Sequence, residues 1–135
     1  MAKTVFTIDG NAFSTLEEFY DEVERVLIPG AVWGRSLDAL NGILRGGFGT
    51  PAGGFVLQWQ ASDLSRERLG RAETVRQLEA RLRGCHATNR VAVAEELERV
   101  QRGVGSTVFD WLVEIIRTHG IGGDEAEDGV ELVLA

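Results

Sequence analysis

The sequence predicts an α/β fold in which helices pack on a three-stranded parallel sheet. Three short runs rich in β-branched and aromatic residues indicate strands: 5–8, 55–60 and 130–134. Helical patterns fill the intervals between them, and strands separated by helices pair in parallel through right-handed crossovers. With 135 residues, 44% of them apolar, the chain can bury a core. We therefore expect a single domain over residues 1–135.

The first strand and the first helix are marked by short local signals. The run 5–8 is closed by the turn pair Asp9-Gly10. Ser14 and Glu17 match a capping box, in which each side chain satisfies a free N–H group at a helix start. Apolar residues then recur at helical spacing until Pro29-Gly30. A helix is thus expected from Ser14 to the residues before Pro29.

A second helix is expected to begin near Ser36. Its apolar stripe is formed by Leu37, Leu40, Ile43 and Leu44. The loop 45–54 that follows is rich in glycine, but it comes after a helix and before a strand, the reverse of the order that aims a helix N-terminus at phosphate. We interpret this loop as a flexible connection or as a contact surface that lets a partner approach the backbone.

The second half of the chain is helical up to the last strand. The segment 62–102 is rich in Arg and Glu and contains two amphipathic stretches, separated by 84–89. A further helix is expected to open at 105–107 and to stop at His119-Gly120. The acidic loop 124–128 leads into the third strand. The segment 62–102 therefore adds extra helices between the second strand and the last long helix.

The charge of the chain is negative and uneven. The net charge is −7, which argues against nucleic acid as a partner because phosphate binding requires clustered Lys and Arg. Residues 60–102 hold nine Arg against seven acidic residues, so the remaining residues hold five basic and fourteen acidic groups. The acid is concentrated in the two ends of the sequence. If these ends meet, they would attract a basic partner; the alternative is that the charge only keeps the protein soluble.

Several features favour a cytoplasmic protein without a membrane partner. The opening residues 1–9 leave no room for the apolar segment of a signal peptide. No run approaches the roughly 18 apolar residues of a membrane span. Cys85 is the single cysteine, which excludes an internal disulfide and agrees with a reducing compartment.

The residue types needed for catalysis or metal binding are not arranged in known patterns. Cys85 and His86 are adjacent and His119 is distant, so no set of zinc ligands is formed, and no metal or cofactor is expected. We expect Cys85 to be half-buried between helices and His119 to lie at a helix C-terminus, where the dipole favours it. The expectation is a protein that is not an enzyme. An enzyme that uses Cys85 or His119 remains a third alternative.

A surface with aromatic and acidic side chains is the remaining candidate. Trp33 precedes the second helix, and Asp38 lies in its first turn. Asp110 and Glu114 share a face of the last long helix, beside Trp111. These side chains could anchor a basic partner. The alternatives are core packing for Trp33, a favourable dipole contact for Asp38, and a solvated helix face for Asp110 and Glu114.

The segment Trp33-Gly34-Arg35-Ser36-Leu37-Asp38-Ala39-Leu40 resembles the aromatic-Gly-x-Asn-Leu-Asp-Ala-Leu segment of the barstar family of ribonuclease inhibitors. The opening strand, the first helix and the strand 55–59 that ends in Trp59 follow in the family's order. The last helix and the strand 130–134 close the same pattern. The Arg-rich part 62–102 looks like an enlarged helical connection within a barstar-like fold.

The resemblance implies an inhibitor that inserts its second helix and the preceding loop into the active site of a secreted microbial guanyl-specific ribonuclease, as a 1:1 complex. Acidic side chains of the family pair there with catalytic Arg, Lys and His. By position, Asp38 is the first helix carboxylate, Val32 stands where the family has a tyrosine, and Glu114 matches a carboxylate on the last helix. The implied partner-binding residues are Val32, Trp33, Gly34, Asp38, Asn41, Gly42, Arg45, Gly46 and Glu114.

The sequence departs from the family's pattern within this segment. Gly42 stands where a second aspartate is expected, Asn41 replaces a tryptophan, and Ser36 replaces an asparagine. Glycine cannot mimic a phosphate, so another carboxylate, the backbone or a different target is required. A related ribonuclease could contact Asn41, Arg45 and the loop around Gly46 and Phe48. The alternative function is a barstar-fold protein that binds a different basic toxin or a regulatory partner.

Overall fold

The computed structural model describes residues 3–46 and 48–135 and has the predicted α/β architecture. The strands are β1 (Val5–Asp9), β2 (Val56–Gln60) and β3 (Glu131–Leu134). They form a parallel sheet in the order β1-β2-β3, with Trp59 of β2 between Ile8 and Leu134 of its neighbours. The predicted three-stranded parallel sheet is therefore confirmed.

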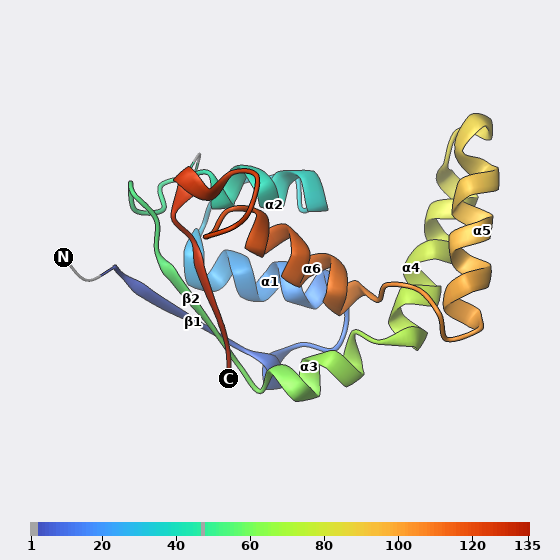
Figure 1. The fold of residues 1–135 in the computed structure, drawn as a ribbon, viewed down its shortest axis with the longest axis horizontal. Coiled ribbons are helices and arrows are strands. Elements are labelled where there is room, and N and C mark those ends of the chain that lie inside the picture. Colours follow the sequence, from blue (N-terminus) through green and yellow to red (C-terminus); the bar gives the residue numbers. More distant parts are fainter. Residues whose placement is uncertain (1–2, 47) are drawn as a thin grey trace.

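In the described residues, six α-helices accompany the sheet. They are α1 (Leu16–Leu27), α2 (Leu37–Leu44), α3 (Ser62–Arg68), α4 (Arg71–Gly84), α5 (Arg90–Gln101) and α6 (Val108–Thr118). Figure 1 shows α1, α2 and α6 together on one side of the sheet. Among the helices of residues 3–46 and 48–135, none is long and apolar enough to cross a membrane.

The core lies between one face of the sheet and these three helices. Alternate residues of the strands point into it, and Ile8, Leu57 and Trp59 are almost fully buried. The indole N–H of Trp59 donates to Ser65 Oγ of α3 at 2.9 Å, so its polar group is satisfied in the core. The residues between them are exposed, like Thr7 of β1, or half-buried, like Gln58 of β2. The sheet therefore has one covered face and one open face.

The start of α1 differs from the predicted capping box by one residue. Thr15 is the N-cap, and its hydroxyl accepts a hydrogen bond from the Glu18 amide at 3.1 Å. The Glu18 carboxylate in turn accepts from the Ser14 amide at 3.0 Å. Glu17, the predicted capping residue, instead pairs with Arg76 of α4. A contact with a distant helix thus decides which of two adjacent glutamates closes the cap.

Helices α4 and α5 form a hairpin that stands apart from the sheet at one end of the molecule (Figure 1). Leu78, Val93 and Val100 are buried in this part of the chain. Cys85, at the turn of the hairpin, is half-buried, as expected, and its thiol lies 3.6 Å from the Leu82 carbonyl oxygen. The predicted helical connection over 62–102 is present.

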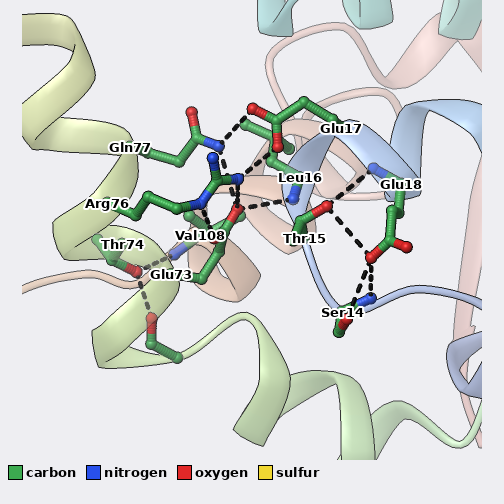
Figure 2. Close-up of polar contacts among 11 residues, drawn as sticks. Ser14, Thr15, Leu16, Glu17, Glu18, Glu73, Thr74, Arg76, Gln77 and Val108 are labelled. Atoms are coloured by element: carbon green, nitrogen blue, oxygen red, sulfur yellow. Dashed lines mark hydrogen bonds and ion pairs between the residues drawn. The ribbon is translucent and has the colours of Figure 1, made fainter.

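The first turn of α4 caps the N-termini of two core helices (Figure 2). The buried Glu73 carboxylate accepts a hydrogen bond from the Leu16 amide, the first of α1, at 2.8 Å. The neighbouring Thr74 hydroxyl accepts from the Val108 amide, the first of α6, at 2.8 Å. Both amides lack a partner within their own helix, so these bonds satisfy them. The hairpin is thereby joined to the core through polar contacts.

Two glycines bring the loop before β2 against the loop before β3. Gly54 has a φ of +102°, and a Cβ atom on it would lie 2.1 Å from the carbonyl oxygen of Gly129. Gly129 has a φ of +70°, and its own Cβ would lie 2.5 Å from the Gly53 carbonyl oxygen. The glycine-rich loop therefore lets another segment of the same chain approach its backbone. Gly47, within this loop, lies outside the described residues.

Candidate functional site

Helix α2 has one face in the core and one face in solvent. The Ser36 hydroxyl caps it by accepting a hydrogen bond from the Ala39 amide at 3.1 Å. Three apolar side chains are buried: Leu40, Ile43 and Leu44. Asp38 is exposed in the first turn, where the helix dipole favours a negative charge. The predicted helix start near Ser36 is correct, and the Asp38 carboxylate is exposed.

Trp33 shapes the preceding loop from within the core. Only 9% of this residue is exposed, and its indole N–H donates to Glu24 Oε1 at 3.0 Å. Its ring packs edge-on against Tyr20, with centroids 5.5 Å apart. Burial raises the pKa of Tyr20 to about 12. Of the two roles considered for Trp33, an exposed anchor and core packing, the structure has core packing.

The residue before Trp33 is the exposed apolar side chain of this loop. Val32 is 96% exposed. Gly34 is exposed as well. Arg35 has a φ of +48°, and its guanidinium pairs with Asp21 and donates to the Glu17 carbonyl oxygen. These contacts to α1 hold the loop in the conformation that turns Val32 outward.

The C-terminal half of α2 interacts with the end of α6 and the acidic loop. Asn41 Oδ1 lies 2.9 Å from His119 Nε2. Arg45 donates twice to Glu125, at 2.8 Å to Oε1 and 3.0 Å to Oε2. Gly42 is half-buried, and a Cβ atom on it would meet only Phe48, at 3.5 Å. This part of α2 therefore presents an ion pair and a position without a side chain.

Gly46 follows the helix with a φ of +95°, a conformation that favours glycine. Its amide donates to the Ile43 carbonyl oxygen at 3.0 Å and so closes the last turn of α2. The residue is half-exposed. Gly46 thus directs the chain away from the helix end, and its contact with a partner stays a prediction.

His119 lies at the C-terminus of α6, as expected, and is buried there. It is the C-cap of α6 and is 0% exposed. Its Nδ1 lies 2.6 Å from Asp128 Oδ2, and its Nε2 contacts Asn41. The expectation of a simple dipole contact was incomplete, because the sequence does not show that two distant side chains meet this imidazole. His119 links α6, α2 and the acidic loop.

The exposed side of α6 supplies further carboxylates. Glu114 is exposed, whereas Asp110 closes a capping box with Thr107 by accepting from its amide at 2.9 Å. Trp111 is half-buried, and the Arg81 guanidinium of α4 lies 5.3 Å from its ring. Asp110 therefore has a structural role, and Glu114 is the carboxylate that α6 leaves available.

A groove of about 320 Å³ runs between α2 and α6. Its lining comes from α2, α6 and the acidic loop: Asn41, Arg45, Trp111, Glu114, Ile115, Thr118 and Glu125. The groove brings together three of the predicted partner-binding residues, while Val32 and Asp38 lie on the preceding loop and the first turn of α2. A larger hollow of about 900 Å³ lies between α6, the loop 120–124 and β3.

Glu125 is a residue of this groove that the sequence analysis did not identify. The pattern shows only that it belongs to an acidic loop, 80 positions after its partner Arg45. Hydrogen bonds from Arg45 hold the pKa of Glu125 below its ordinary value. The same interaction raises the pKa of Arg45. Both groups are therefore charged near neutral pH.

The polar groups of His119, Glu125 and Asp128 already have partners within the protein. One nitrogen of His119 and carboxylate oxygens of Glu125 and Asp128 lie within 4.8 Å of one another, an arrangement that could hold a metal ion. However, Asp128 and Asn41 already contact the two ring nitrogens, and Arg45 binds both oxygens of Glu125. The same contacts leave His119 poorly placed to act as a general base.

Comparison with known proteins identifies one family. A protein-family model described as Barstar (barnase inhibitor) matches residues 3–109. The match includes β1, α1, the loop with Val32, α2 and β2, and it ends in the first turn of α6. No curated protein matches the chain.

Proposed function

The chain belongs to the barstar family, and from this premise we propose that it is a protein inhibitor that binds and covers the active site of a secreted microbial guanyl-specific ribonuclease. The observation that carries the proposal is the family match over residues 3–109, which includes the loop before α2 and α2 itself. We further propose that it acts in the cytoplasm as a 1:1 complex and without a cofactor.

The exposed groups on α2 and its preceding loop support this function. Val32 offers an apolar side chain that is 96% exposed, and Asp38 offers an exposed carboxylate in the first turn of α2. A ribonuclease binds the phosphates of its substrate with cationic side chains, and a carboxylate can pair with the same groups. We propose that Gly34, Asn41, Gly42, Gly46 and Glu114 belong to the same contact surface.

Asp38→Ala is expected to weaken the binding of the ribonuclease by more than about 1 kcal/mol, because it removes a carboxylate from the centre of the contact. Raised salt should slow association of the wild-type protein. Glu114→Ala should have a smaller effect, since a charge at the rim is screened by water. The measurement is a titration of a small secreted guanyl-specific ribonuclease with each variant, following residual activity.

Asp63→Ala is the matched control, because Asp63 is also an exposed aspartate in the first turn of a helix, α3. In Figure 1, α3 follows the carboxyl end of β2, and α1 and α6 lie between it and α2. The Asp63→Ala variant should inhibit the ribonuclease as strongly as the wild-type protein does. Equal inhibition by Asp38→Ala and the wild-type protein would mean that α2 is not the contact surface.

Gly42→Asp is expected to strengthen binding to a barnase-like ribonuclease. A Cβ atom at this position meets only Phe48, at an ordinary contact distance of 3.5 Å, so the helix accepts the side chain. The new carboxylate would lie one turn beyond Asp38 on the same exposed side. We expect the inhibition constant to fall about tenfold, with unchanged thermal unfolding. A rise in that constant would indicate that the natural target requires the small residue.

The alternative is a barstar-fold protein whose partner is a different basic toxin or a regulatory protein. Gly42, in place of a second helix carboxylate, favours this alternative. Binding assays against a panel of ribonucleases and unrelated basic proteins separate the two. Stoichiometric loss of ribonuclease activity supports the inhibitor. Binding to another basic protein, with no inhibition across several guanyl-specific ribonucleases, supports the alternative.

A further inference from the structure

Among the residues of α2 itself, only the first turn carries a negative charge. Asp38 is the single carboxylate of α2, and Gly42, one turn later, has no side chain. The next exposed residue, Arg45, carries a positive charge. A partner whose cationic groups extend along α2 would therefore meet a repulsive charge at the end of the helix unless another group compensates for it.

Glu125 provides a carboxylate at that place. It comes from the loop between α6 and β3, and both of its oxygens accept hydrogen bonds from Arg45, at 2.8 and 3.0 Å. Its side chain remains 31% exposed and lines the groove with Asn41 and Glu114. The ion pair neutralises Arg45 and leaves part of a carboxylate accessible at the surface.

Hydrogen bonds of its loop fix the backbone position of Glu125. The Glu125 amide donates to the Thr118 carbonyl oxygen at 2.9 Å, and the Asp128 amide donates to the Glu125 carbonyl oxygen at 3.1 Å. Buried His119 joins Asp128 to Asn41 of α2, at 2.6 and 2.9 Å. A carboxylate held in place before binding loses little conformational freedom when a partner arrives.

We propose that Glu125 is a specificity-determining residue of the partner-binding surface and receives an arginine or lysine side chain of the bound ribonuclease. This inference rests on the proposed function. Arg45 is the internal cation that occupies Glu125 in the free protein. With 52% of its side chain exposed, Arg45 can turn into solvent when a cation of the partner approaches. Arg45 then competes with the partner for Glu125, rather than contacting the partner directly, while the contacts of the loop with Thr118 and His119 keep Glu125 in place.

The experiment compares single variants in the ribonuclease titration. Glu125→Gln keeps the size of the side chain and removes its charge, and it should raise the inhibition constant about tenfold. Glu127→Gln is the matched control, because Glu127 is an exposed glutamate of the same loop, and it should stay within about twofold. Arg45→Ala should leave inhibition equal or tighter, since the competing cation is removed. Thermal unfolding of all variants checks that the loop is intact.

If Arg45→Ala weakens inhibition as much as Glu125→Gln does, Arg45 is the contact and the inference is overturned. If Asp38→Ala weakens inhibition while Glu125→Gln matches Glu127→Gln, the inference fails and the proposed function stands. If the wild-type protein inhibits no guanyl-specific ribonuclease, the proposed function fails, and the inference fails with it.

Discussion

Gly54→Ala is expected to lower the free energy of unfolding by about 4 kcal/mol, because the added Cβ collides with backbone atoms that cannot move independently. The Cβ would lie 2.1 Å from the Gly129 carbonyl oxygen and 2.7 Å from that of Asp128. The φ of +102° is also unfavourable for any residue with a side chain. Denaturation by urea, followed by circular dichroism, measures the loss.

Gly53→Ala measures the backbone strain without the steric collision. Gly53 has a similar φ of +84°, but no atom lies within 4 Å of its expected Cβ. Its substitution should therefore cost only the backbone strain, about 1 kcal/mol. If Gly53→Ala and Gly54→Ala lower the free energy of unfolding equally, the loop before β2 and the loop before β3 can move apart at little cost. Their contact would then not fix the position of the loop before β3. If Glu125 contacts the ribonuclease as proposed, a Gly54→Ala protein that folds should also inhibit it less strongly, since Glu125 belongs to the displaced loop.

Glu73→Ala is expected to destabilise the protein by about 3 kcal/mol, since it removes a buried acceptor and leaves a buried amide without a partner. The Glu73 carboxylate accepts from the Leu16 amide at 2.8 Å and from Gln77 at 3.1 Å, and it pairs with Arg76 at 2.6 Å. Chemical denaturation gives the magnitude. Amide hydrogen exchange should show faster exchange at Leu16, the first residue of α1.

Glu79→Ala is the control, because Glu79 lies exposed on the same helix and undergoes the same chemical change. It should alter stability by less than about 0.5 kcal/mol. Glu73→Gln should fall between the two, as its amide oxygen can still accept from Leu16. Equal stability of Glu73→Ala and Glu79→Ala would show that water or another side chain caps α1 as well.

The same carboxylate predicts a dependence on pH. Burial alone would raise the pKa of Glu73, but hydrogen bonds from Arg76, the Leu16 amide and Gln77 outweigh it and lower the pKa below its ordinary value. A group whose pKa is lower in the folded state stabilises the protein above its unfolded pKa, ~4.3 for glutamate. That stabilisation is lost as pH falls through the folded pKa. The stability of Glu73→Ala should therefore decline less on acidification than that of the wild-type protein.

Local patterns were sufficient for the elements of the fold. The run 55–60, rich in β-branched and aromatic residues, predicts a strand, and Ser36 followed by an apolar stripe predicts α2, since both signals depend on residues close in sequence. The capping of α1 was wrong by one residue for the opposite reason. Glu17 and Glu18 are equivalent in a local pattern, and only the position of Arg76 on α4 distinguishes them.

The candidate site divides in the same way. Val32 and Asp38 could be proposed from the segment around Trp33, because the resemblance to the barstar family is carried by adjacent residues. The burial of Trp33 could not be predicted from the sequence, because its ring contacts Glu24 and Tyr20 of α1. Glu125 was missed because its partner Arg45 lies 80 positions away.

The sequence by itself determined the strands, the helices and the acidic balance, because hydrophobic periodicity, capping residues and charge are properties of short segments or of composition. The family followed from the resemblance carried by the adjacent residues 33–40. Only the tertiary structure decided which polar groups satisfy one another across the chain. It joined Glu73 to α1, His119 to α2, and Glu125 to Arg45. Such pairs form because a buried amide, imidazole or carboxylate must find a partner, and the partner that packing brings near can come from any position in the sequence.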